Sequence, residues 1–221
     1  MKTVLCYGDS NLRGFIPGSF NETTGLSGRY DKNQRWSGLL QQKLGNQYDI
    51  IEDGVNGRTT NLDEITPGRA DRNGLKSLPV ALEAAFPIDL VIFWLGTNDT
   101  KLQFNRSADK IAEGLKTLIN LVKLSEKGPN GAPPEILIIA PQPVIKINDI
   151  HPEFALDADE KSNQLANAYQ KLAEKENCHF FDVGQIITSS LIDGVHIDEN
   201  DNKKVAEVIY NKVLETLEVY A

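Results

Sequence analysis

Hydrophobic positions in this chain fall into two kinds of segment that alternate along it. Short apolar runs, partly β-branched, predict buried strands at five places: residues 3–7, 49–55, 89–95, 135–140 and 179–183. The longer segments between them repeat apolar residues at helical spacing, most clearly in residues 108–126, 159–176 and 200–220. The pattern therefore predicts repeated β–α units.

The central runs contain no alternation with polar residues. Residues 90–95 read LVIFWL and residues 136–140 read ILIIA. Such strands are typical of a parallel sheet that has helices on both faces. We therefore expect an α/β fold, a three-layer α/β/α sandwich, and its 221 residues fit one domain over residues 1–221.

Composition narrows the classes of partner. The chain has 31 acidic and 23 basic residues and a formal charge of -8. This balance disfavours nucleic acid and anionic membrane surfaces, which are bound chiefly through clustered lysine and arginine. No apolar run approaches the roughly 20 residues that span a bilayer. We expect a cytoplasmic protein.

Three long segments resist regular assignment: residues 16–34, 56–73 and 141–158. Loops of this length are uncommon in compact domains and are often functional. They follow the first, second and fourth predicted strands, and right-handed winding brings such connections to the same edge of a sheet. We expect them to surround a site at that edge.

The first strand is followed by Gly8-Asp9-Ser10-Asn11. Ser10 thus lies just beyond the carboxyl end of a strand, where ligands bind in open α/β sheets. The alternative is that Asp9 and Ser10 only cap a helix through their side-chain oxygens.

A serine hydroxyl is a weak nucleophile and needs an adjacent general base. Of the three histidines, His196 follows Asp193 at a three-residue spacing within a glycine-containing turn. That spacing lets the carboxylate reach Nδ1 while Nε2 faces Ser10. The alternative for Asp193 is a cap on the final helix.

Four blocks carry a family resemblance: residues 8–11 (GDSN), 54–60 (GVNGRTT), 96–99 (GTND) and 193–196 (DGVH). Together these blocks, which are spread over nearly the whole chain, resemble those of the SGNH, or GDSL-type, hydrolases. Residues 35–40, 57–60, 95–101 and 180–184 are similar to the arylesterase and acyltransferase branch. The resemblance implies a flavodoxin-like fold with a five-stranded parallel sheet of order 2-1-3-4-5.

The resemblance also implies roles for individual residues. Ser10 would be the nucleophile, with Asp193 and His196 completing a triad. The oxyanion hole would consist of the backbone N–H groups of Ser10 and Gly57 and the side-chain amide of Asn98. Taken alone, Gly57 also fits a turn with positive φ, and Asn98 fits an Asx turn.

For substrates, the branch implies small acyl groups, especially acetyl, on aryl or alkyl alcohols, with acyl transfer to alcohols or peroxide when the pocket excludes water. It also implies homo-oligomers, and no cofactor or metal is required. A carbohydrate or lipid deacylase and a catalytically silent binding module are the alternatives. Asn11 departs from the leucine of many members. The candidate substrate-binding residues are Asn11, Phe15, Trp36, Thr97, Lys101, Phe154 and Val195. Core packing is the alternative for the proposed pocket walls, and it is favoured for Trp36 at the start of a predicted helix.

Overall fold

The computed structural model describes residues 1–21, 23–64, 70–147, 151–154 and 157–218. Its strands form one five-stranded parallel sheet in the order β2-β1-β3-β4-β5, which confirms the expected topology. The strands are β1 (Lys2–Gly8), β2 (Tyr48–Gly54), β3 (Leu90–Trp94), β4 (Glu135–Ala140) and β5 (His179–Asp182).

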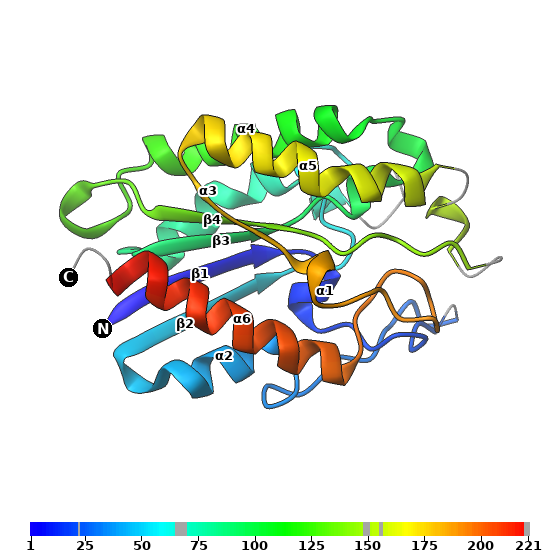
Figure 1. Cartoon of the computed structure of the whole chain (residues 1–221), viewed down its shortest axis with the longest axis horizontal. Helices are drawn as coiled ribbons and strands as arrows, with labels where there is room; N and C mark the ends of the chain where they lie inside the picture. Colours follow the sequence, from blue (N-terminus) through cyan, green and yellow to red (C-terminus); the bar gives the residue numbers. More distant parts are fainter. Residues whose placement is uncertain (22, 65–69, 148–150, 155–156, 219–221) are drawn as a thin grey trace.

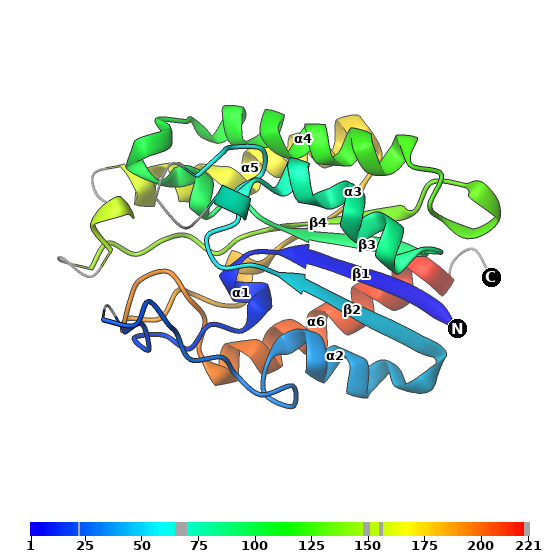
Figure 2. The same ribbon diagram turned by 180° about the vertical axis from the view of Figure 1, so that it is seen from behind.

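Helices cover both faces of this sheet (Figures 1 and 2). One layer contains α3 (Gly74–Ala85), α4 (Ala108–Leu124) and α5 (Ala158–Glu176), and the opposite layer contains α2 (Trp36–Leu44) and α6 (Glu199–Glu218). The three-layer prediction is thus confirmed. Residues 219 and 220 of the predicted final helix lie outside the described residues. None of the described helices combines the length and apolar character that a membrane crossing requires.

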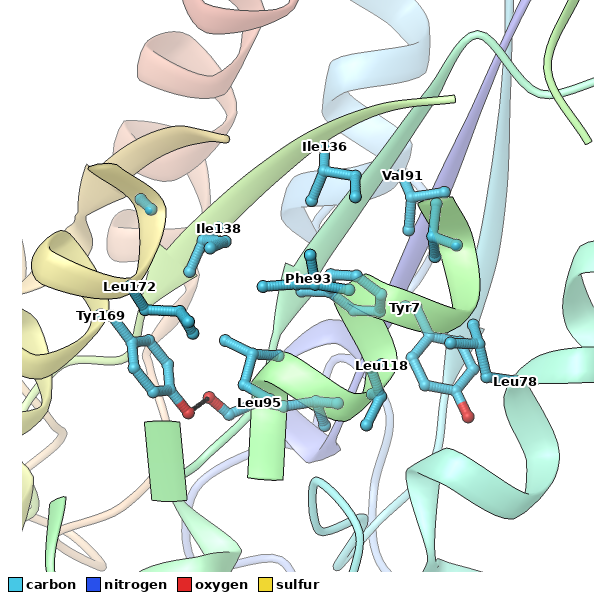
Figure 3. Packing of buried hydrophobic residues seen from close by; sticks show 14 of the residues in the cluster. Tyr7, Leu78, Val91, Phe93, Leu95, Leu118, Ile136, Ile138, Tyr169 and Leu172 are labelled. Carbon is cyan, nitrogen blue, oxygen red and sulfur yellow. Dashed lines mark hydrogen bonds between the residues drawn. The ribbon is translucent and has the colours of Figure 1, made fainter. Parts of the chain in front are cut away.

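Burial on both faces explains why the strands lack alternation. In β1, Leu5 and Tyr7 belong to the core under α3, α4 and α5, while Val4 and Cys6 belong to the core under α2 and α6. Neighbouring residues of this strand therefore enter different layers, and residues 4–7 are all buried and hydrophobic. Figure 3 shows the first of these cores, where the Tyr169 hydroxyl donates a hydrogen bond to the Leu95 carbonyl oxygen at 3.1 Å.

The carboxyl ends of the strands lie level with one another. Gly8 pairs with Gly54 of β2 and with Trp94 of β3. A Cβ at Gly8 would lie 2.9 Å from both the Trp94 carbonyl oxygen and the Leu12 Cβ, so the first turn after β1 requires glycine. The short helix α1 (Ser10–Arg13) begins at once. The segments that follow α1 and that precede α6 lie together at this end of the molecule, opposite the N-terminus (Figures 1 and 2).

Candidate active site

Ser10 is the first residue of α1, and Asp9 is the N-cap. The Asp9 carboxylate accepts a hydrogen bond from the Asn11 backbone N–H at 2.9 Å. The helix-cap alternative therefore describes Asp9 correctly, yet it leaves the Ser10 hydroxyl free for another partner. That partner is His196, whose Nε2 lies 3.0 Å from Ser10 Oγ.

Asp193 orients the imidazole of His196 from its other side. The Asp193 Oδ2 atom lies 2.8 Å from His196 Nδ1, and Oδ1 accepts the backbone N–H groups of Val195 and His196. Burial opposes ionisation, but the hydrogen bond from His196 lowers the pKa of Asp193 to about 2. Asp193 does not cap α6; the Asp198 carboxylate accepts the Asp201 N–H there.

His196 is shielded from water. Burial lowers its pKa below the ordinary value, while the hydrogen bond with Asp193 acts in the opposite direction. The Phe15 ring stacks on the imidazole with centroids 3.8 Å apart and an interplanar angle of 12°. The neutral imidazole, with its proton on Nδ1, is therefore favoured near neutral pH and can accept a proton at Nε2.

The loop that carries His196 is held by contacts from other loops. Gly194 has φ +74°, and its carbonyl oxygen accepts the Ile145 N–H at 2.8 Å. The Gln142 amide donates to the Val195 carbonyl oxygen at 2.9 Å. Asn11, a candidate substrate-binding residue, accepts a hydrogen bond from the Ile197 N–H through Oδ1 at 3.2 Å, so it ties α1 to this loop.

Asn98 follows β3 and begins a short 3-10 turn, Asn98–Thr100. Its side-chain amide donates to the Arg58 carbonyl oxygen at 3.1 Å and, at a longer 3.4 Å, to Asp9 Oδ2. Gly57 lies in the turn after β2 with φ +78°, which agrees with the turn alternative. These contacts bring the second and third sequence blocks against the first.

Buried charge supports the Asn98 side of the site. Arg58 donates through Nη1 to the Gly8 carbonyl oxygen at 3.0 Å and through Nη2 to Asp53 Oδ1 at 2.7 Å. Asp99 is fully buried and accepts both the backbone N–H and the hydroxyl of Thr60. Burial raises the pKa of Asp9 to about 7 and that of Asp99 to about 6. Through their hydrogen bonds, Asp9 holds the turn before α1 and Asp99 ties the turn after β3 to Thr60.

Four predicted substrate-binding residues, Phe15, Lys101, Phe154 and Val195, contact His196 or each other. Phe15 stacks on His196, and Lys101 Nζ lies 5.5 Å from the centre of the Phe154 ring. Phe154 and Val195 share a small apolar cluster, completed by Val144 and Ala158. Thr97 is buried beside Asn98.

Trp36 requires a correction, because it lies in the core. Its side chain is fully buried between the sheet and the layer of α2 and α6, with its ring 5.6 Å from that of Trp94. An indole buries a large apolar area most effectively inside such a layer. Sequence reasoning missed His151 instead, whose ring lies 6.1 Å from the His196 ring. Its only signal was its position in residues 141–158.

The comparisons with known proteins agree with this geometry. Residues 6–203 match the GDSL-like Lipase/Acylhydrolase family. The chain belongs to this family. As a GDSL-like acylhydrolase it is a serine hydrolase, and more specifically a serine esterase.

Solved GDSL-like structures resemble the chain over nearly its whole length. The aryl esterase of M. smegmatis is 33% identical, with a TM-score of 0.90 over 98% of this chain and 100% of that one. A carbohydrate acetylesterase from Sinorhizobium meliloti is 38% identical, with a TM-score of 0.88 over 97% and 99%. An acetylxylan esterase from Xylanibacter ruminicola is 24% identical over 93% of this chain, which spans only 42% of that relative's length.

Proposed function

We propose that Ser10, His196 and Asp193 are the catalytic triad of an esterase that hydrolyses small, acetyl-type esters of aryl or alkyl alcohols. The observation that carries the proposal is the unbroken chain of contacts from Ser10 Oγ through His196 to Asp193, at 3.0 and 2.8 Å. The nucleophile thus has a general base beside it, and the base has a carboxylate that orients it, as acyl transfer requires.

The reaction proceeds through an acyl-enzyme. Ser10 Oγ attacks the ester carbonyl carbon while His196 Nε2 takes the hydroxyl proton and then gives it to the departing alcohol oxygen. In the second half, His196 takes a proton from water, the hydroxide oxygen attacks the acyl carbon, and the proton returns to Ser10 as the acid leaves. Asp193 stabilises the imidazolium in both halves.

The oxyanion of each tetrahedral intermediate is held by the N–H groups of Ser10 and Gly57 and by the Asn98 amide. Supporting this role, these residues follow the level ends of three adjacent strands. The long 3.4 Å contact from Asn98 to Asp9 leaves that N–H available for a better acceptor. Positive φ at Gly57 suits a close approach of backbone to substrate.

The acyl and alcohol groups lie among Phe15, Thr97, Lys101, Phe154 and Val195, with Asn11 beside the nucleophile. The apolar side chains beside His196 favour small apolar groups and limit access of water. Alcohols or peroxide then compete with water for the acyl-enzyme, so the esterase also transfers acyl groups.

A second candidate is the deacylation of carbohydrates. It is supported by the S. meliloti carbohydrate acetylesterase, 38% identical, and by the X. ruminicola acetylxylan esterase. Deacylation of lipids uses the same chemistry. Rates of hydrolysis of aryl acetates, acetylated sugars and lysolipids distinguish these three functions. All three would use the same catalytic groups, and they differ in the substrate that the pocket accepts.

Hydrolysis of p-nitrophenyl acetate by Ser10→Ala tests the mechanism. We expect its rate to fall to near the uncatalysed level and a fluorophosphonate probe to label Ser10 in the native protein. Ser125→Ala, at the end of α4, is the matched control and retains full activity and labelling. Unchanged activity in Ser10→Ala, or labelling of a different serine, would contradict the proposal.

We also propose that the esterase is a cytoplasmic homo-oligomer. Exposed apolar side chains on the two segments that flank the site support assembly: Phe20, Leu26, Leu191 and Ile192. Light scattering tests this, and a monomer at working concentration would contradict it. Fractionation of the source cells tests the location.

A further inference from the structure

His151 faces the proposed triad and is itself paired with a carboxylate. Its Nδ1 atom lies 3.5 Å from Glu153 Oε1, while His196 Nδ1 lies 2.8 Å from Asp193 Oδ2. The two imidazole rings are 6.1 Å apart and inclined at 70°. Two imidazoles, each with a carboxylate at Nδ1, therefore meet at the site.

Donor atoms of three of these residues come close together. One from each of His151, Asp193 and His196 lies within 4.8 Å of the others. Two imidazoles and a carboxylate form a common ligand set for Zn²⁺, at about 2.0 to 2.2 Å from each donor. Donors around one tetrahedral ion are about 3.3 Å apart at such bond lengths. The three donors, within 4.8 Å of one another, would therefore have to draw closer, and the half-buried His151 side chain is the most exposed of the three.

We propose that His151, Asp193 and His196 bind one divalent first-row transition ion, such as Zn²⁺ or Cu²⁺, as a reversible inhibitor. The second carboxylate, Glu153, contacts the His151 ring and orients it, as carboxylates do behind metal-bound histidines. Cu²⁺ should bind more tightly than Zn²⁺ in a site with nitrogen ligands.

The ion would inhibit the enzyme whether it binds Nε2 or Nδ1 of His196. An ion on Nε2 takes the lone pair that accepts the Ser10 proton, and an ion on Nδ1 displaces the proton held by Asp193. Both remove the general base on which the proposed function rests.

The local charge favours a cation. Asp193 and Glu153 place two carboxylates against the two imidazoles. Lys101 acts on both Glu153 and His196 and opposes the ion. The two negative charges outweigh this one positive charge, so a divalent ion gains more than a monovalent one.

Calorimetric titration of Ser10→Ala with ZnCl₂ tests binding independently of the esterase mechanism, because this variant keeps all three donors. We expect one Zn²⁺ per chain. Adding His151→Gln should weaken binding at least about tenfold. Adding His179→Gln should not weaken binding. His179 pairs with Glu135 at 3.4 Å at the amino end of β5, whereas the site lies at the carboxyl ends of the strands.

In the native protein, Zn²⁺ should inhibit p-nitrophenyl acetate hydrolysis and a chelator should restore it. His151→Gln, normalised to its own rate without metal, should need at least about tenfold more Zn²⁺. Zn²⁺ binding that does not depend on His151, or no binding at millimolar Zn²⁺, would overturn the proposal.

Discussion

The two halves of the proposed site are built in different ways. The base half, His196 and Asp193, lies on the loop between β5 and α6. This loop accepts hydrogen bonds from Gln142 and Ile145 and donates one to Asn11. The oxyanion half, Asn98 and Gly57, follows strands whose register is fixed, and buried charges lie beneath it. The sheet itself therefore positions the donors, whereas tertiary loop contacts position the base.

Among changes that leave Ser10 and His196 in place, Asp193→Asn should give the largest loss, because it alters the carboxylate that orients His196 through Nδ1. Asparagine is almost the same shape but no longer fixes the proton on His196 Nδ1 or stabilises the imidazolium. We expect kcat for p-nitrophenyl acetate to fall about 10⁴-fold while the midpoint of denaturant unfolding changes little. A loss below tenfold would show that Asp193 only supports the loop.

Asn98→Ala breaks the oxyanion half and should cost less. Removing one of three donors typically lowers kcat by about 10²- to 10³-fold. Because the base half is intact, the pH dependence of kcat/KM should keep its native midpoint, and a moved midpoint would contradict the separation of the two halves. Asn105→Ala is the control for the loss of a nearby asparagine, because Asn105 follows the next 3-10 turn, Leu102–Phe104. This variant should retain activity.

The sequence predicted the strands and helices well, and it placed the proposed reactive groups beside them, for physical reasons. Strands buried on both faces leave an unmistakable apolar run, and Ser10, Asn98 and His196 stand in blocks that follow such runs or precede the last helix. The sheet order came from the family resemblance and was confirmed.

Contacts between distant segments were not predictable in the same way. The stack of Phe15 on His196 and the nearness of His151 depend on how irregular loops pack, and no periodicity records that. Trp36 is the opposite case, a residue predicted for the site that lies in the core. A large aromatic near a family motif suits a pocket wall or a core equally, and only the packing of α2 against α6 decides for the core.

Gly194→Ala should disturb the base half through its backbone. The residue has φ +74°, and an added Cβ would lie 2.0 Å from the Ile145 carbonyl oxygen. Gly25→Ala is the matched control, because Gly25 has φ +68° with nothing within 4 Å of an added Cβ. Both variants pay the cost of positive φ, roughly 1 to 2 kcal/mol, measured by denaturant unfolding.

Only Gly194→Ala should also lower kcat/KM, since only there must the backbone beside His196 move. Equal effects of the two variants on activity would mean that the Ile145 contact does not position the base.

Phe15 offers the smallest and most specific test of the base half. Burial lowers the pKa of His196, and the neutral form is the base, so the acid limb of kcat/KM should have its midpoint below pH 6.5. Phe15→Ala admits water to the imidazole and favours its charged form. Its acid limb should therefore shift upward by a few tenths of a pH unit.

Phe15→Leu separates the two things that the ring supplies. Leucine keeps an apolar cover but removes the aromatic face, which attracts the charged imidazolium weakly. If exclusion of water sets the pKa, the acid limb of Phe15→Leu should stay close to the native position while that of Phe15→Ala moves up. A downward shift in both variants would instead assign the effect to the aromatic face, and burial by Phe15 would no longer explain the lowered pKa of His196.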